Sequence, residues 1–445
     1  MEKMILPGEW DNASIPPLPG KPPMPNRRAR RPRKRRLAVV ITGVIILVLA
    51  LTGGTALAFF KLNPTILSNA LHHGGPKDGQ KYQHNTMTYV SPTSTMTMGM
   101  NNPMQGVTTI NNLNRISVVG STAFILDGHG KTISADANPY GIAIAPNGMI
   151  PNALKPGDIL VTNFGAMNTG TTLVRFPAGK GPGLLFNTMN SPATKGPAFE
   201  AFNPLTGTDW VANFSGNNVQ VFRPNGTILA TITNPLFKMP WAMASNHGMH
   251  NPMDGGVGSF FTTNTGDATI DRIDVIAAKN GTAFRVFQIG QLTQINGGTK
   301  LNATWVPSLQ IGGKKYADVL LVLDLANNRV AAYPNSTTMN TTNMRSTNKG
   351  ITVFQGKPLN TPVGLTINPL NGDLLVVNAN DNNLVELNLA QGKAVGTKQL
   401  DNVPVDAQSG NGSALFGVAA TKDAKGNLEV FFTDDNMNTL NVLSM

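Results

Sequence analysis

The chain repeats one short pattern six times: an apolar stretch that ends in Asn or Asp, followed by a polar turn and a second apolar stretch. The copies lie roughly 50 to 60 residues apart. Short apolar runs bounded by turn residues are typical of β-strands. The six endings are "ILVTN" at Asn163, "DWVAN" at Asn213, "FFTTN" at Asn264, "LLVLD" at Asp324, "LLVVN" at Asn378 and "VFFTD" at Asp434.

A further strand precedes most copies and opens on Pro, an aromatic or a small residue, as in "PYGIAIAP" from Pro139, "PWAMA" from Pro240 and "LFGVAA" from Leu415. Each unit then has three or four short strands. A sheet of that size cannot bury both faces alone, whereas units stacked radially around an axis bury them against one another. The sequence predicts an all-β fold, a six-bladed β-propeller over residues 114–445.

The recurring polar residue has a local structural role in this fold. An Asn or Asp side chain can accept backbone N–H groups of the turn two or three residues further on, and Asn tolerates the left-handed backbone that such turns need. We interpret the strand-end residues as structural turn staples: Asn163, Asn213, Asn264, Asp324, Asn378 and Asp434.

The frame "P-x-G", an apolar strand, "L-x-V-x-(N/D)" and "N-N-x-V" is clearest between Pro362 and Leu387. Over about residues 114–445 it resembles the NHL-repeat family and the wider group of six-bladed, TolB-like propellers. The resemblance implies a fold and not an activity, because propellers host binding, scaffolding and hydrolysis alike.

The sixth copy reaches Met445 with only three clear strands. A spare strand within residues 116–130 is expected to complete that blade. Pairing the two ends of the domain in this way would remove two exposed sheet edges and close the ring.

The N-terminal segment predicts membrane attachment. Residues 1–36 form a Pro-rich, basic tail, and Leu37 to Phe60 carry no charge. As a helix, 37–60 is long enough to cross a hydrocarbon core of roughly 30 Å. The cations before it place the N-terminus in the cytoplasm and the rest of the chain outside the cell membrane. We expect a retained, single-pass signal-anchor rather than a signal peptide cleaved after Ala58, followed by an extracytoplasmic tether over 61–113.

Composition excludes several classes of function. The chain has no cysteine, so disulfides, thiol catalysis and Cys-ligated metals are ruled out. Its formal charge of +11 comes mainly from the tail, and we therefore expect no nucleic-acid partner.

The remaining features predict a membrane-anchored, non-catalytic binding or scaffold module, a monomer without cofactor, whose propeller binds an unknown protein or glycan. One alternative is a metal-dependent hydrolase resembling the SMP-30/gluconolactonase propellers, with a Ca²⁺-like cation at the channel mouth. Its candidate residues are Glu200, Asn264, Asn378 and Asp434.

A second alternative is Cu(I) binding. Thioether and imidazole groups suit this ion, and the chain groups them in "MTMGM" and "HGMHNPM". The candidate ligands are Met96, Met98, Met100, His247, Met249 and His250. The competing interpretation is that methionine is simply frequent in this sequence and fills gaps.

Overall fold

The computed structural model describes residues 110–146, 154–187, 189–246, 258–278, 281–295, 298–339, 345–406 and 410–445. The predicted cytoplasmic tail, the predicted membrane span at 37–60 and most of the predicted tether lie outside these ranges. Within the described ranges, no helix combines the length and apolar character that a membrane span requires.

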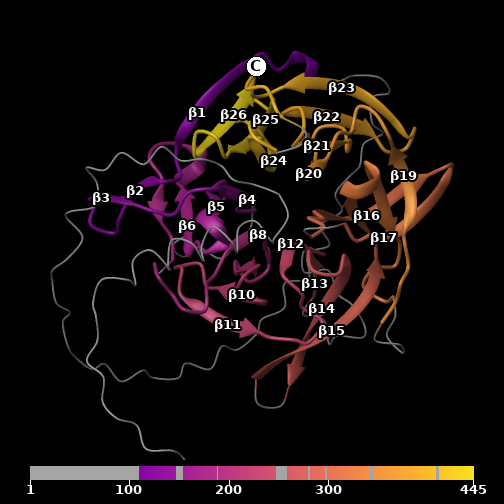
Figure 1. Cartoon of the computed structure of the whole chain (residues 1–445), viewed down its shortest axis with the longest axis horizontal. Helices are drawn as coiled ribbons and strands as arrows, with labels where there is room; N and C mark the ends of the chain where they lie inside the picture. The colour runs from indigo at the N-terminus through magenta and orange to yellow at the C-terminus, as the bar shows by residue number, and fades with distance from the viewer. Residues whose placement is uncertain are drawn as a thin grey trace, which may run out of the picture. The chain divides into compact units, whose positions relative to one another are not determined.

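Six sheets, antiparallel except for the parallel pair β2 and β7 in blade 1, are arranged around an axis (Figure 1). Their innermost strands contact one another in the cyclic order β4, β8, β12, β16, β20, β24 and back to β4. The predicted six-bladed, all-β propeller is therefore confirmed. Blade 1 contains β2 (Phe124–Leu126), β3 (Thr132–Ser134), β4 (Pro139–Ile144), β5 (Ile159–Asn163), β6 (Thr172–Phe176) and β7 (Leu184–Leu185).

The other blades have four strands each. Blade 2 is β8 (Pro197–Phe202), β9 (Asp209–Asn213), β10 (Asn218–Phe222) and β11 (Ile228–Ile232); blade 3 is β12 (Pro240–Ser245), β13 (Ser259–Asn264), β14 (Thr269–Ala278) and β15 (Gly281–Gln291). Blade 4 is β16 (Ala303–Ile311), β17 (Lys314–Asp324), β18 (Arg329–Tyr333) and β19 (Ile351–Gln355); blade 5 is β20 (Pro362–Ile367), β21 (Leu374–Asn378), β22 (Asn383–Asn388) and β23 (Lys393–Gln399).

Blade 6 joins the two ends of the ring. It consists of β24 (Leu415–Lys422), β25 (Leu428–Asp434) and β26 (Thr439–Ser444), and its outer strand is β1 (Arg115–Ser121), which pairs antiparallel with β26 (Figure 1). The predicted closure by a strand preceding the first repeat is confirmed. The ordered ring begins slightly earlier than residue 114, because Ile110 and Leu113 are buried in its core.

Short 3-10 helices occur at η2 (Ile110–Asn112), η3 (Ala166–Asn168), η4 (Pro177–Gly179) and η5 (Leu325–Asn327). The first of these holds the chain against blade 5. The backbone N–H of Ile110 donates to Glu386 on β22, and Lys398 on β23 donates to the Leu113 carbonyl.

The second strands of the blades are buried along their whole length, as in β5, β9, β13 and β21. Both faces of each sheet pack against neighbouring blades, so these strands read as continuous apolar runs rather than alternating ones. The glycine of the "P-x-G" frame is required because the inner strands of neighbouring blades also pack closely. A Cβ at Gly364 or Gly417 would collide with the backbone of the adjacent inner strand, at Phe416 or Tyr140 respectively.

Asn residues in the turn after the second strand connect neighbouring blades. Their backbone is left-handed, with φ between 46° and 53°, and the side-chain Oδ1 accepts the N–H of the residue just before the next inner strand. We call these four residues the inter-blade clamps. Asn217 accepts from Met239, Asn328 from Thr361, Asn382 from Ala414 and Asn438 from Asn138, with N to Oδ1 distances of 2.7–2.9 Å.

Candidate functional site

The strand-end residues, the clamps and a group of aromatic residues all lie at one end of the ring. The first residue of an inner strand pairs with the last residue of the next strand, as in Pro240 with Asn264 and Pro362 with Asn378. Strand starts, strand-end residues and the turns that contain the clamps therefore lie at the same end. We call this end the mouth.

Aromatic side chains close the ring axis at the mouth. Tyr140, Trp241 and Phe416 are each the second residue of an inner strand, in blades 1, 3 and 6. The rings of Tyr140 and Phe416 stack with centroids 4.0 Å apart, and those of Tyr140 and Trp241 lie 5.5 Å apart. Because blades 1 and 3 are not neighbours, this contact lies close to the axis. Phe164, Phe199 and Phe214 pack around Trp241.

Lys300 points onto these rings from the loop between β15 and β16. Its Nζ lies 5.2 Å from the Trp241 ring centroid, 5.4 Å from that of Phe416 and 5.9 Å from that of Tyr140. At such distances the negative faces of aromatic rings attract a cation. Burial lowers the pKa of Lys300, and the negative charge of Asp435 partly opposes that effect.

Asp435 follows β25 directly and supplies a carboxylate beside Lys300. Burial raises its pKa to about 7, although Lys300 favours the ionised form. Its Oδ1 is buried and has no hydrogen-bond partner among the described residues, and the same holds for the indole Nε1 of Trp241. Lys300 itself forms no hydrogen bond or ion pair with any part of the chain that the structure describes.

Two exposed methionines lie in the mouth turns that follow β5 and β25. Met167, after β5, is 88% exposed, and Met437, after β25, is 70% exposed. Met167 is also held in a left-handed backbone conformation, with φ of 54°, which is uncommon for a residue other than Gly or Asn. Exposed, adaptable apolar side chains of this kind are favoured on binding surfaces.

The strand-end residues make different hydrogen bonds from those expected of turn staples. Asp434 does accept the turn N–H of Met437. Asn264 and Asn378 instead accept the N–H groups of Lys238 and Asn360, which belong to the loops entering their own blades. Asn163 donates to the Thr122 carbonyl, Asn213 donates to Asn218 and Gln220, and Asp324 accepts from Arg329.

The reason for this difference is the geometry of the mouth. The loop entering each inner strand passes beside the strand end, and its backbone groups are as close as those of the turn. Sequence reasoning assigned the binding role to the strand-end residue and missed the clamps, which follow it by four positions. The "N-N-x-V" frame contains the signal, because the first Asn is the clamp in the blade-5 copy, Asn382.

The four hydrolase candidates do not gather at one point. Asn264, Asn378 and Asp434 lie at the mouth, opposite the first residues of β12, β20 and β24. Glu200 lies further along β8, opposite Val211. Among the described residues, no group of three or more His, Cys, Asp or Glu side chains could hold a metal ion.

Glu200 pairs with a residue that the sequence analysis did not single out. Asp209 lies opposite Phe202, two residues further along β8, so the two carboxyl groups are diagonal neighbours on one face of the hairpin. Glu200 is 6% exposed and Asp209 is fully buried. No hydrogen-bond donor reaches the oxygens of Glu200 within the described chain. Burial raises the pKa of both groups well above the ordinary value, and the charge of Asp209 adds to the effect at Glu200.

We expect Glu200→Gln to flatten the pH dependence of stability. The unfolded chain ionises these carboxyl groups from about pH 4, whereas the folded chain keeps them protonated to higher pH. Unfolding therefore releases protons above pH 4, and the free energy of unfolding falls as the pH rises until the folded groups ionise too. Urea denaturation across this range should show a shallower fall in Glu200→Gln than in the wild type.

Asp423→Asn provides the control for this measurement. Hydrogen bonds from Asn427 lower the pKa of Asp423, which is the opposite direction, so this substitution should not flatten the decline. An unchanged decline in Glu200→Gln would show that the buried pair does not govern it.

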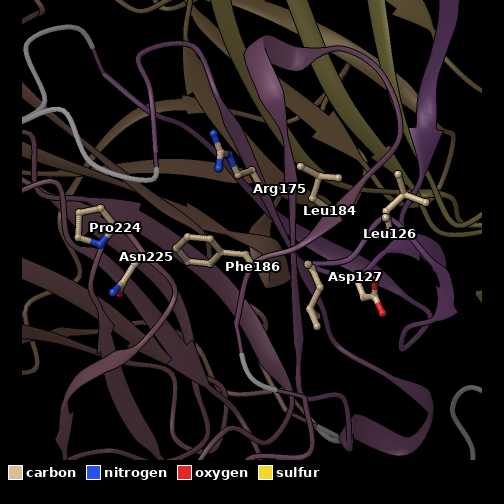
Figure 2. A pocket seen from close by; sticks show the side chains of 10 residues that line it. Leu126, Asp127, Arg175, Leu184, Phe186, Pro224 and Asn225 are labelled. Carbon is tan, nitrogen blue, oxygen red and sulfur yellow. The ribbon is translucent and has the colours of Figure 1, made fainter. Parts of the chain in front are cut away.

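A separate pocket of about 440 Å³ lies at the end of the ring opposite the mouth (Figure 2). Leu126, Leu184 and Phe186 line it on the side of blade 1, and the turn at Pro224 and Asn225 lines it on the side of blade 2. Its one arginine, Arg175, is ion-paired with Asp158 at 2.6 Å. Asp127 adds a second charged group to the lining, but the aromatic cluster beside Lys300 lies at the mouth.

The soft-metal candidates cannot be placed. Met96, Met98 and Met100, and the cluster of His247, Met249 and His250, lie outside the described residues. Binding of Cu(I) stays a prediction from the sequence.

No protein family and no curated protein matches the chain. Several solved structures show a low similarity to the chain. A streptogramin B lyase is 15% identical over 72% of this chain and 85% of its own, with a TM-score of 0.40. A catalytically inactive virginiamycin B lyase from Staphylococcus aureus, with quinupristin, is 14% identical over 74% and 99%, with a TM-score of 0.42. A chain of the nidogen/laminin complex is 17% identical over 65% and 86%, with a TM-score of 0.40. At these TM-scores and identities the likeness supports no statement about this chain, and the resemblance to NHL repeats stays a prediction.

Proposed function

We propose that this protein is a non-catalytic binding module whose ligand docks on the mouth of the propeller. The ligand is a protein or a glycan outside the cell, and the chain is held at the cell membrane by residues 37–60 as a single-pass monomer. The membrane attachment rests on the apolar segment and the positive charges before it.

One observation supports a docking site at the mouth. At the mouth, the buried Asp435 Oδ1 and Trp241 Nε1 lack hydrogen-bond partners in the described chain, and the ammonium of the partly exposed Lys300 lies over the Trp241 ring. Polar groups buried without partners are costly, and sites that bind ligands are where proteins retain them. Exposed Met167 and Met437 on the surrounding loops add apolar area that a ligand can cover.

The hydrolase alternative has less support. It requires Glu200 to share a cation with residues at the mouth, and the register of β8 separates it from them. The copper alternative rests on residue types alone.

Substitutions at the two ends of the ring test the proposal. Met167→Glu with Met437→Glu adds two charges to exposed positions at the mouth. Leu205→Glu with Leu370→Glu adds the same charges to exposed positions, 46% and 41%, in turns at the opposite end. Biosensor binding of the full-length protein to cell envelopes of the producing organism should fall at least about tenfold for the mouth variant, because each buried charge costs more than ~1 kcal/mol.

The variant at the opposite end should bind like the wild type. Equal losses for both variants, or no binding by the wild type, would overturn a docking site at the mouth.

A further inference from the structure

We propose that Tyr140, Trp241, Phe416 and Asp435 form a cage for an alkylammonium group of the ligand, and that Lys300 occupies this cage until the ligand displaces it. The proposal rests on the proposed docking function and specifies the chemistry that the mouth recognises.

The charge of the cage follows from the groups that build it. Three aromatic rings present their faces to the Lys300 Nζ at 5.2–5.9 Å, and the face of an aromatic ring is negative. The backbone N–H of Asp435 donates to the carbonyl of Ala414, two residues before Phe416, so its carboxylate lies at the same end of blade 6, and its negative charge acts on Lys300. An anion would be repelled by both kinds of group, so the complementary ligand is a cation.

The type of cation follows from the hydrogen bonds. The ammonium of Lys300 has three N–H donors, and it has no acceptor among the described residues. Lys300 is partly exposed, so water can reach those donors, but the faces of the three rings offer them no lone pair. A quaternary ammonium has no N–H donors and is weakly hydrated, so it loses little by entering a cage of rings, and it interacts with the Asp435 carboxylate through charge alone. The cage therefore suits a methylated ammonium better than it suits the lysine that occupies it.

Displacement is feasible because Lys300 comes from a loop. It lies between β15 and β16, and the rings lie on inner strands fixed by the neighbouring blades. The side chain can leave without any movement of the cage. The apparent affinity of the wild type for a cation is then the affinity of the free cage multiplied by the fraction of molecules whose cage is free.

Two substitutions at Lys300 separate an empty cage from a filled one. Lys300→Ala removes the resident side chain and opens the cage, whereas Lys300→Met fills it with an uncharged chain of similar length. The probes are choline and 3,3-dimethyl-1-butanol, which has the same shape without the charge. Isothermal titration of the full-length protein, in a sugar-based detergent that contains no choline, measures both.

We expect Lys300→Ala to bind choline at least about tenfold more tightly than the wild type or Lys300→Met does. It should also prefer choline over the neutral probe by at least about tenfold. Asp435→Asn, combined with Lys300→Ala, should lower choline affinity severalfold. Absence of choline binding by Lys300→Ala, or equal binding of the two probes, would overturn the cage.

These outcomes are distinguishable from failure of the proposed function. Choline binding by Lys300→Ala, without any envelope binding by the wild type, would retain the cage and overturn the docking function. Envelope binding that depends on the mouth, without choline binding by Lys300→Ala, would retain the docking function and overturn the cage.

Discussion

Deletion of residues 110–121 should destabilise the propeller severely. This segment contains η2 and β1, so its loss leaves β26 as an exposed sheet edge and removes Ile110 and Leu113 from the core. Each fully buried side chain of this size stabilises by about 1.5–3 kcal/mol, and total stabilities are about 5–15 kcal/mol. We expect a melting temperature lower by on the order of 10 °C, or aggregation through the open edge.

A deletion of equal length, residues 94–105, is the control. It falls in the predicted tether and removes no residue of the described ring, so thermal unfolding followed by circular dichroism should show a nearly unchanged transition. If both deletions lower the melting temperature equally, β1 does not close the ring in solution.

The second large effect is expected at an inter-blade clamp. Asn382 is fully buried, its Oδ1 accepts the Ala414 N–H, and its Nδ2 donates to the carbonyls of Val403 and Gly412. Asn382→Ala removes the side-chain partner of the Ala414 N–H and of the Val403 carbonyl, leaves the Gly412 carbonyl with Asn436 alone, and places alanine at a φ of 51°. The Ala414 N–H is buried whereas Val403 is exposed, and an unsatisfied buried group costs about 1–3 kcal/mol, so together with the left-handed alanine we expect a loss of about 2–4 kcal/mol in the free energy of unfolding.

Asn335→Ala separates the clamp from the backbone strain. Asn335 has a φ of 55°, and its exposed side chain makes no hydrogen bond within the described chain. Its substitution should lower the free energy of unfolding only by the strain of alanine in the left-handed conformation, about 1 kcal/mol. Chemical denaturation measures both variants, and equal losses would mean that the side-chain bonds of Asn382 contribute little.

The strands and their order followed from local pattern. Continuous apolar runs such as Leu374 to Asn378 are required wherever both faces of a short sheet are buried, and six copies require a ring. The missing strand in the sixth copy and the spare strand before the first one predicted the closure by β1. All of this depends on the composition of short segments, which a sequence displays directly.

The hydrogen-bonding partners did not follow from local pattern. A strand-end Asn such as Asn378 has the turn N–H groups nearby in sequence, but the loop entering the blade is equally near in space. The choice between them depends on loop paths. The same limit applies to Glu200, whose environment is set by Asp209 across the hairpin and by the adjoining blade rather than by its own strand.

The aromatic residue in second position of an inner strand was visible in the sequence as "PY", "PW" and "LF", but its meaning was not. Tyr140, Trp241 and Phe416 are far apart in the chain and meet only because their strands begin at the same end of one axis. Lys300 lies in a connecting loop without any repeated pattern, so no local signal could direct it to those rings. The sequence determined the blades, because burial of short strands is a local requirement. Tertiary structure alone decided which side chains meet at the mouth, because that depends on how the six blades close around the axis.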